Sequence, residues 1–238
     1  MRTLFLSLLT LFTVTAIPAQ EIVEEVVATD TVAIDDKNVA RYPVCAAFIG
    51  LPDVALPLLQ GNVRLDMIDY FASGMKTPSA NALAGKSRIT SLTPDKLTAE
   101  ITPASSVTLC LLPSGKKEVV AMITTYALPQ PDSKISFFEM TKLAGDSVSM
   151  TPLPQHKVFT IPSMKEWLTD NGKHNRQDVE RLVPFMPVSY TYSPATKILT
   201  LSNNVNDLVA EADRDSVSAL LKKELHYRWD GKKFKLQK

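Results

Sequence analysis

The chain has 238 residues, 26 basic and 25 acidic side chains, a formal net charge of +1 and 45% apolar residues. A chain of this length and hydrophobic content has enough apolar material to bury a core, which excludes an intrinsically disordered protein. The near-neutral charge excludes a general binder of nucleic acid, because such proteins are basic overall.

The first residues predict export. They combine Arg2, an apolar run over residues 4–14, and small residues at Ala16 and Ala19. This order is typical of a signal peptide that is cut after Ala16 or, as favoured here, after Ala19. The apolar run is too short to span a bilayer. We therefore expect a signal peptide over residues 1–19 and a mature periplasmic or secreted protein without a transmembrane segment.

A flexible lead-in is expected over residues 20–41, which are acidic, rich in valine and without turn residues. The folded part is expected to begin at Tyr42. The next apolar stretch, residues 51–60, contains Pro52 followed by Asp53. Proline suits the first turn of a helix, so one or two helical turns are predicted there.

The clearest predicted helix runs from Val63 to Met75, because its apolar residues fill one broad arc at 100° per residue. Asp66 lies opposite this arc, and Arg64 falls inside it. We expect Asp66 to have a structural role near the helix start, where a negative charge is stabilising. Arg64 is expected to reach a carboxylate or a carbonyl outside its own helix and to tie the helix start to the sheet.

Strand patterns follow, and turn residues join most of them into hairpins. Strands are expected over residues 87–92, 96–102, 105–113, 117–129, 134–140, 188–194 and 197–203, with a last hairpin over 225–237. Short helices are expected over residues 163–170, 175–185 and 213–225. The Asp230–Gly231 pair in the last hairpin suits a type I′ turn.

This order of elements predicts an α+β fold with an antiparallel sheet and helices on one face. Strands without regular crossover helices argue against a parallel doubly wound sheet. Two interpretations stay open: two duplicated α/β modules over residues 42–150 and 151–238, or one compact domain built from both segments.

The duplication rests on a short motif, Arg-x-Asp, that occurs at Arg64 and Asp66 and again at Arg176 and Asp178. The features that flank the two copies occur in the same order along the chain, which is typical of an internal repeat. A motif that recurs is more typical of architecture than of catalysis. Arg176 is therefore expected to anchor its helix as Arg64 does.

No motif indicates a cofactor, a metal or a catalytic centre. The three histidines lie in different segments, and no zinc or calcium ligand spacing occurs. The segment "ANALAGKS", residues 80–87, has Ala80 where a phosphate-binding loop has its first glycine, and no G-x-S-x-G elbow is present. We therefore expect no cofactor and a protein that is not an enzyme.

Two cysteines, Cys45 and Cys110, both lie in apolar surroundings. Such surroundings suit either buried free thiols or a buried bridge, and both interpretations stay open. A bridge would close a loop of about 65 residues and contribute about 4 kcal/mol.

The C-terminal residues are rich in lysine, with aromatic residues between the charges. A candidate contact surface for anionic polymers of the envelope comprises Tyr227, Arg228, Trp229, Lys232, Lys233 and Phe234. The alternative is the solvated face of an edge hairpin, where lysine discourages pairing between molecules.

The segments "RLDMIDY" and "PDSKISFF" resemble an exported Bacteroidales family that is catalogued as a domain of unknown function, number 3256 of its series. The resemblance covers residues 45–235. It implies an uncharacterised envelope or secreted protein and supplies no catalytic residues.

The expected function is a non-enzymatic binding module for a protein or a glycan of the envelope, with no nucleic-acid partner. The alternatives are a structural or assembly component, and a hydrolase of peptide or cell-wall material. A hydrolase would need a deep cleft that places a serine or cysteine beside one of the histidines.

Overall fold

The computed structural model describes residues 39–237 except 116, 128, 145 and 146. These residues belong to one compact unit, Asp36–Lys238. The expected signal peptide and all but the end of the expected lead-in lie outside the described residues.

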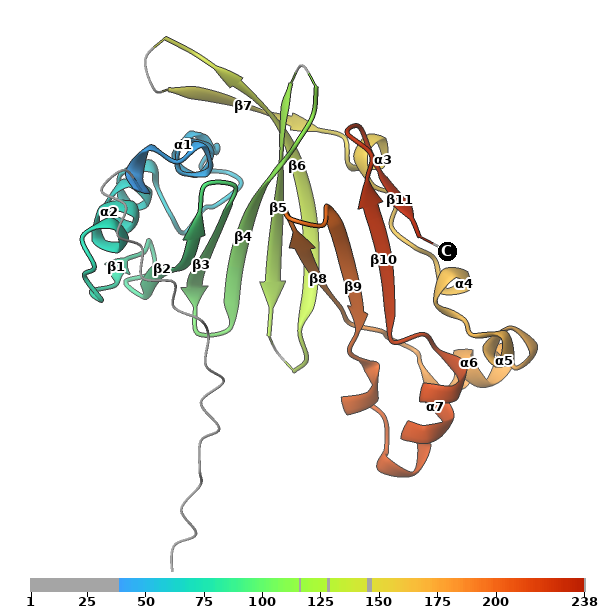
Figure 1. Ribbon diagram of the computed structural model, residues 1–238. Coiled ribbons are helices and arrows are strands. Elements are labelled where there is room, and N and C mark those ends of the chain that lie inside the picture. The colour runs from blue at the N-terminus through green and yellow to red at the C-terminus, as the bar shows by residue number, and fades with distance from the viewer. Residues whose placement is uncertain (1–38, 116, 128, 145–146, 238) are drawn as a thin grey trace, which may run out of the picture. The chain divides into compact units, whose positions relative to one another are not determined.

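A seven-stranded sheet forms the first half of the fold (Figure 1). Its strands lie side by side in chain order, and every neighbouring pair is antiparallel. They are β1 Ser79–Ala80, β2 Lys86–Thr93, β3 Lys96–Thr102, β4 Ser105–Leu112, β5 Glu118–Tyr126, β6 Asp132–Lys142 and β7 Val148–Leu153. The expected module boundary at residue 150 falls inside β7, and the division into two modules stays a prediction.

A second, four-stranded antiparallel sheet has the order β11-β10-β9-β8. Its strands are β8 Val188–Ser193, β9 Ile198–Asn203, β10 Glu224–Trp229 and β11 Phe234–Leu236. The predicted α+β fold with antiparallel sheets is therefore confirmed. The predicted type I′ turn is wrong, because four residues, 230–233, separate the paired Trp229 and Phe234.

Ten helical segments among the described residues complete the fold. They are η1 Val39–Arg41, α1 Pro43–Gly50, α2 Gly61–Ala72, α3 Gln155–Val158, α4 Met164–Trp167, α5 Asp170–His174, α6 Arg176–Leu182, η2 Val205–Asp207, η3 Glu211–Asp213 and α7 Arg214–Leu220. The helix α1 was not expected, and residues 51–60 form successive turns instead of the predicted helical turns.

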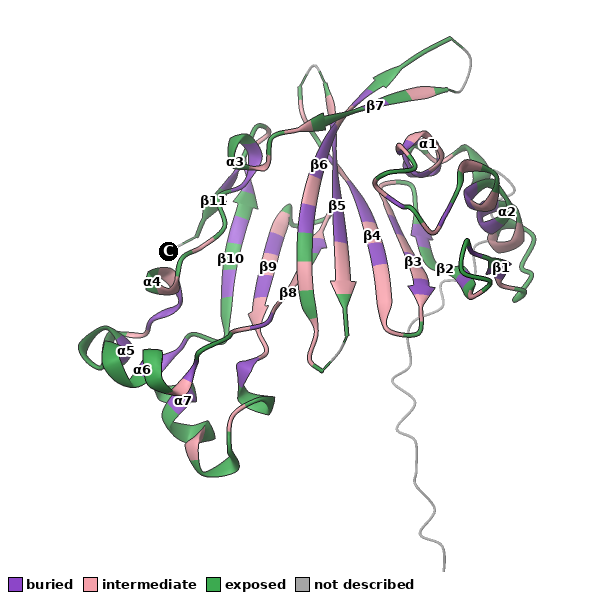
Figure 2. Ribbon diagram, turned by 180° about the vertical axis from the view of Figure 1, so that it is seen from behind, coloured by how far each residue is buried: buried purple, intermediate pink, exposed green. Residues whose placement is uncertain are grey.

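The seven-stranded sheet has a hydrophobic core on each face, because successive side chains of a strand point to opposite sides. In β4, Leu109 packs with α1 and α2, whereas Cys110 packs with the four-stranded sheet. Figure 2 shows this alternation as bands of buried residues along the strands. The sheet is therefore a middle layer between two helices and a second sheet.

Phe234 of β11 joins the two sheets. Its ring centroid lies 6.2 Å from that of Phe137 in β6, 5.8 Å from Tyr192, 6.1 Å from Phe159 and 5.1 Å from Trp229. Rings at these separations in tilted or edge-to-face arrangements attract one another beyond the effect of area burial. The aromatic cluster fixes the position of the C-terminal hairpin on the core.

The edge strand β8 is sealed by polar side chains of β6. Asp132 Oδ1 accepts a hydrogen bond from the Val188 N–H at 3.0 Å, and Ser133 Oγ accepts one from the Tyr190 N–H at 3.1 Å. These bonds satisfy backbone donors that an unpaired sheet edge would otherwise offer to another chain. They also fix the four-stranded sheet against β6.

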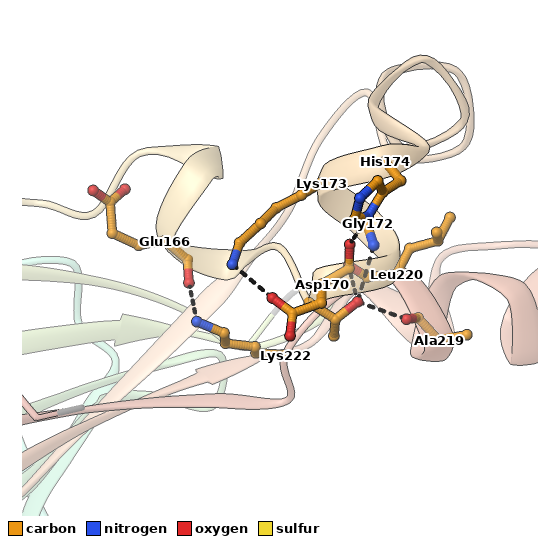
Figure 3. A network of polar contacts seen from close by, with 9 residues as sticks. Glu166, Asp170, Gly172, Lys173, His174, Ala219, Leu220 and Lys222 are labelled. Atoms are coloured by element: carbon orange, nitrogen blue, oxygen red, sulfur yellow. Dashed lines mark hydrogen bonds and ion pairs between the residues drawn. The ribbon is translucent and has the colours of Figure 1, made fainter.

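Polar contacts tie α5 to the end of α7 (Figure 3). Thr169 caps α5 by accepting a hydrogen bond from the Gly172 N–H, and its hydroxyl lies 2.7 Å from the Ala219 carbonyl oxygen, to which it donates. Gly172 lies so close to Leu220 that a β-carbon would overlap the Leu220 carbonyl. A glycine is therefore required where the two helices meet.

Candidate functional site

Arg64, the first candidate from the sequence, is buried, and both of its terminal nitrogens make structural contacts, whereas its Nε has no hydrogen-bond partner. Its side chain is 2% exposed and donates hydrogen bonds to the carbonyl oxygens of Phe48 at 3.1 Å and Leu51 at 2.6 Å. It also forms an ion pair with Asp53 at 2.6 Å. Burial lowers the pKa of the Arg64 guanidinium, and the Asp53 carboxylate partly opposes that shift.

Arg64 therefore reaches carbonyls and a carboxylate outside its own helix, as the sequence predicts. Its partners belong to the end of α1 and the turns that follow, and not to the sheet, so the expected tie to the sheet is wrong. Asp66 is exposed on α2. Because Nη1 of Arg64 binds two backbone carbonyls and Nη2 pairs with Asp53, these contacts give Arg64 an architectural role.

The second copy of the motif has different surroundings. Arg176 is 72% exposed and pairs with Glu180 of its own helix at 2.9 Å. Asp178 pairs with Arg181, again within α6. The expectation that Arg176 anchors its helix as Arg64 does is wrong, because its side chain points to solvent instead of to a neighbouring segment.

The candidate contact surface at the C-terminus divides into buried and exposed residues. Tyr227, Trp229 and Phe234 are 3% to 6% exposed and belong to the core. Arg228, Lys232 and Lys233 are exposed. The predicted mixed aromatic and basic surface is therefore wrong in its aromatic part, since the strand alternates its aromatic residues inward and its charges outward.

A cavity of about 460 Å³ lies where the loop between β10 and β11 meets α3 and the residues after it. We call it the basic pocket, and its lining comprises His156, Lys157, Val158, Phe159, Thr160, Lys232, Lys233 and Phe234. Val158, Phe159 and Phe234 are buried and form an apolar floor. The other five are exposed and form a polar rim.

The ionisable groups of this lining are all basic: His156, Lys157, Lys232 and Lys233. None of the four is in an ion pair with another residue of the described part of the chain. Like charges that share one cavity repel one another and attract an anion. The pocket is therefore a concave, cationic site of the size that small ligands occupy.

Asp230 shapes the loop that carries two of these lysines. Its Oδ1 accepts hydrogen bonds from the N–H groups of Lys232 at 2.9 Å and Lys233 at 2.8 Å, and its Oδ2 pairs with Lys235 at 2.9 Å. The Lys235 ammonium and these two N–H groups hold the pKa of the Asp230 carboxyl well below its usual range. Asp230 therefore stays ionised and fixes the loop backbone, while Lys235 balances its charge.

Comparison with known proteins supplies the family. The family model described as "Protein of unknown function (DUF3256)" matches residues 39–234. The chain belongs to the DUF3256 family. This confirms the family prediction made from the sequence. No curated protein matches the sequence.

The fold of this DUF3256 chain is similar to that of a solved structure, described as a domain of an uncharacterized protein from Porphyromonas gingivalis W83. The two are 18% identical with a TM-score of 0.64, and the match covers 82% of this chain and 98% of that chain. The similarity shows a shared fold. It assigns no activity to either protein.

Both cysteines of this DUF3256 chain are free and buried, which decides between the two interpretations of the sequence. Cys45 belongs to α1 and lies in the core between the helices and one face of the sheet, whereas Cys110 lies in the core on the other face. Burial raises the pKa of the Cys45 thiol to about 11 and that of Cys110 to about 12. Neither thiol is therefore an activated nucleophile.

The described part of the chain shows neither a metal-binding group of side chains nor a membrane-spanning helix. No group of three or more histidine, cysteine, aspartate or glutamate side chains lies together there in a way that could hold a metal ion. No helix there is long and apolar enough to cross a membrane.

Sequence reasoning identified one wall of the basic pocket and missed the other. The basic residues near the C-terminus were evident, but His156 and Lys157 lie about 75 residues earlier in the chain and match no motif. The packing of Phe159 against Phe234 and Tyr227 brings the two segments together.

Proposed function

We propose that this chain is an exported, non-enzymatic binding protein of the cell envelope, and that the basic pocket is its ligand site. The observation that carries the proposal is a cavity of about 460 Å³ with four basic side chains and an apolar floor. Ligand sites of proteins are typically concave, with an apolar lining and a few polar groups that orient the ligand.

A binding role suits the pocket better than catalysis does. The described residues of its lining include a histidine and a threonine, but no carboxylate, serine or cysteine. A nucleophile needs an adjacent base, and that base needs a third group to orient it. The groups of the pocket suit the recognition of an anion better than they suit such a constellation.

Export remains part of the proposal and is supported by the pattern of the first 19 residues. Intact-mass analysis of the protein from the envelope or the medium should show the loss of residues 1–19. Full-length protein in the cytoplasm would contradict this part of the proposal.

The binding site can be tested by affinity capture from an envelope extract of a Bacteroidales species. The bait is the protein from residue 20 onward, in three forms: wild type, Lys232→Ala/Lys233→Ala, and Lys76→Ala/Lys86→Ala. The last variant removes the same charge from exposed lysines outside the pocket. We expect wild type and the control to retain the same envelope component and the pocket variant to lose it. Equal capture by all three forms would overturn the proposal.

A further inference from the structure

The lining of the basic pocket indicates what kind of ligand it takes. We infer that the ligand is an acidic sugar unit, whose carboxylate or phosphate group is held by the basic rim while one face of the ring covers the apolar floor. The inference rests on the proposed function, because it names the ligand class of the same site.

The charge of the rim points to an anionic group. Lys157, Lys232 and Lys233 each carry an ammonium group with three donors, and His156 adds a ring nitrogen. Among the described residues, no acidic side chain lines the cavity. Asp230, the acid next to this wall, has its carboxylate engaged by two backbone N–H groups and by Lys235. A carboxylate or phosphate would therefore meet donors without a competing negative group, and bonds to such ions are the stronger hydrogen bonds.

The floor is rigid and already formed. Phe159 and Phe234 are held by edge-to-face contact with each other, with ring centroids 6.1 Å apart, and Phe159 also contacts Tyr227 at 5.1 Å. Val158 completes the floor and is also buried. A fixed floor costs a ligand little ordering free energy. A sugar ring has an apolar face of C–H groups and an edge of hydroxyls, which matches an apolar floor below a polar rim that includes Thr160.

The size and build of the cavity favour a short sugar unit over a chain. Its volume of about 460 Å³ lies in the lower half of the range for small-ligand pockets, roughly 300–1,000 Å³. Two short segments, residues 156–160 and 232–234, form the whole lining. An acidic peptide, the competing class of ligand, is usually bound as an added strand or in a long groove. The neighbouring edge strand β11 has only three residues.

Matched pairs of sugars test the inference by calorimetry at low salt. Cellobiouronic acid and cellobiose differ by one carboxylate, and glucose 6-phosphate and glucose differ by one phosphate. We expect the acidic member of at least one pair to bind and its neutral counterpart not to bind. Binding of cellobiouronic acid would indicate a carboxylate ligand, and binding of glucose 6-phosphate would indicate a phosphate ligand. A tetraglutamate peptide tests the competing class, acidic peptides.

The variants connect binding to the pocket. Lys232→Ala/Lys233→Ala should weaken binding of the acidic sugar at least about tenfold, because each charged hydrogen bond contributes more than 1 kcal/mol. Lys76→Ala/Lys86→Ala should leave it unchanged. Circular dichroism and unfolding curves establish that both variants are folded.

Binding of the acidic sugar by Asp230→Asn gives a second readout, which separates the orientation of the loop from the charge of its lysines. The substitution removes a negative charge beside the wall, which by itself would favour an anion, and leaves all four basic side chains, but it weakens the bonds that orient the loop. We expect weaker binding than in wild type and stronger binding than in the double lysine variant. Unchanged binding would assign Asp230 no part in positioning the lysines.

Four outcomes would overturn the inference. Equal binding of the acidic and the neutral member in both pairs would make the site a neutral-sugar site and leave the proposed function in place. Binding of tetraglutamate alone would assign the pocket to acidic peptides, again within the proposed function. Failure of every probe, together with loss of envelope capture in the pocket variant, would reject the sugar alone. If every probe failed and the pocket variant captured the envelope component as wild type does, both the proposed function and the sugar inference would be wrong.

Discussion

Two basic regions of this molecule have opposite environments. Arg64 is buried, and two carbonyls and a carboxylate occupy its donors. Lys232 and Lys233 are exposed, line a cavity and pair with no described acid. Removing a buried charge leaves its former partners unsatisfied, whereas removing a solvated one leaves none. The comparison shows that Arg64 serves the fold, whereas no ion pair among the described residues balances the charges of Lys232 and Lys233.

The largest expected effect is the loss of Arg64. Arg64→Ala should lower the free energy of unfolding by about 3 kcal/mol, since the carbonyls of Phe48 and Leu51 lose their donor in a buried place. Urea unfolding measures the change. Arg176→Ala is the matched control and should cost less than about 0.5 kcal/mol, because Arg176 pairs only on the surface of its own helix. Equal losses in the two variants would break the comparison.

Gly172→Ala should cost about 2 kcal/mol, because the new methyl group would overlap the Leu220 carbonyl and push α5 away from α7. Gly115→Ala is the control, since no atom of the described residues lies within 4 Å of the position of its β-carbon. Thermal or urea unfolding of both variants tests this. A neutral Gly172→Ala would mean that α5 is free to shift.

Alkaline pH should destabilise the protein through its buried thiols. The pKa of Cys45 is about 11 and that of Cys110 about 12 when folded, against about 8.5 for an exposed thiol. The raised values favour the folded state below about pH 8.5, and this contribution is lost as the pH rises toward the folded values. The loss should reach about 1 to 2 kcal/mol per thiol near pH 10. Unfolding curves between about pH 8 and pH 10 measure it. A Cys45→Ala/Cys110→Ala variant should show a shallower dependence, and an equal slope would contradict the assignment to the thiols.

The smallest expected effect on stability concerns the basic pocket itself. Lys232→Ala/Lys233→Ala should change the free energy of unfolding by less than about 0.5 kcal/mol, because exposed lysines without partners contribute little. Urea unfolding of this variant and of Arg64→Ala compares directly what the exposed lysines and the buried arginine contribute to the free energy of unfolding. A large loss in the lysine variant would mean that these residues serve the fold and not a ligand.

Most of the strands could be predicted from the sequence, whereas β1 and β7 were not expected. In β10 the burial alternates at every position, and the turn that follows it carries Asp230 and Gly231. The same alternation already indicates that Tyr227 and Trp229 point inward, although the lysines around them suggested a surface. The helix α1 could not be predicted, because "PVCAAFIG" is apolar all round and shows no period.

The site could be predicted only in part. The anchoring of Arg64 follows from its place in an apolar arc, whereas Arg176 repeats the motif without the apolar surroundings that would bury it. The basic pocket depends on a contact between segments about 75 residues apart, which short-range patterns do not encode. A repeated sequence motif is thus weaker evidence for a buried arginine than the apolar periodicity of the residues around it.

The placement of the two cysteines has a consequence for how the protein is made. Their side chains lie on opposite faces of one sheet, so the folded protein has no geometry in which they could be bridged. The unfolded chain has no such barrier. In an oxidising compartment, a bridge between Cys45 and Cys110 would therefore trap the chain outside its native state. Folding would then compete with oxidation, because Cys110 is covered only when the C-terminal four-stranded sheet packs on its face of the seven-stranded sheet.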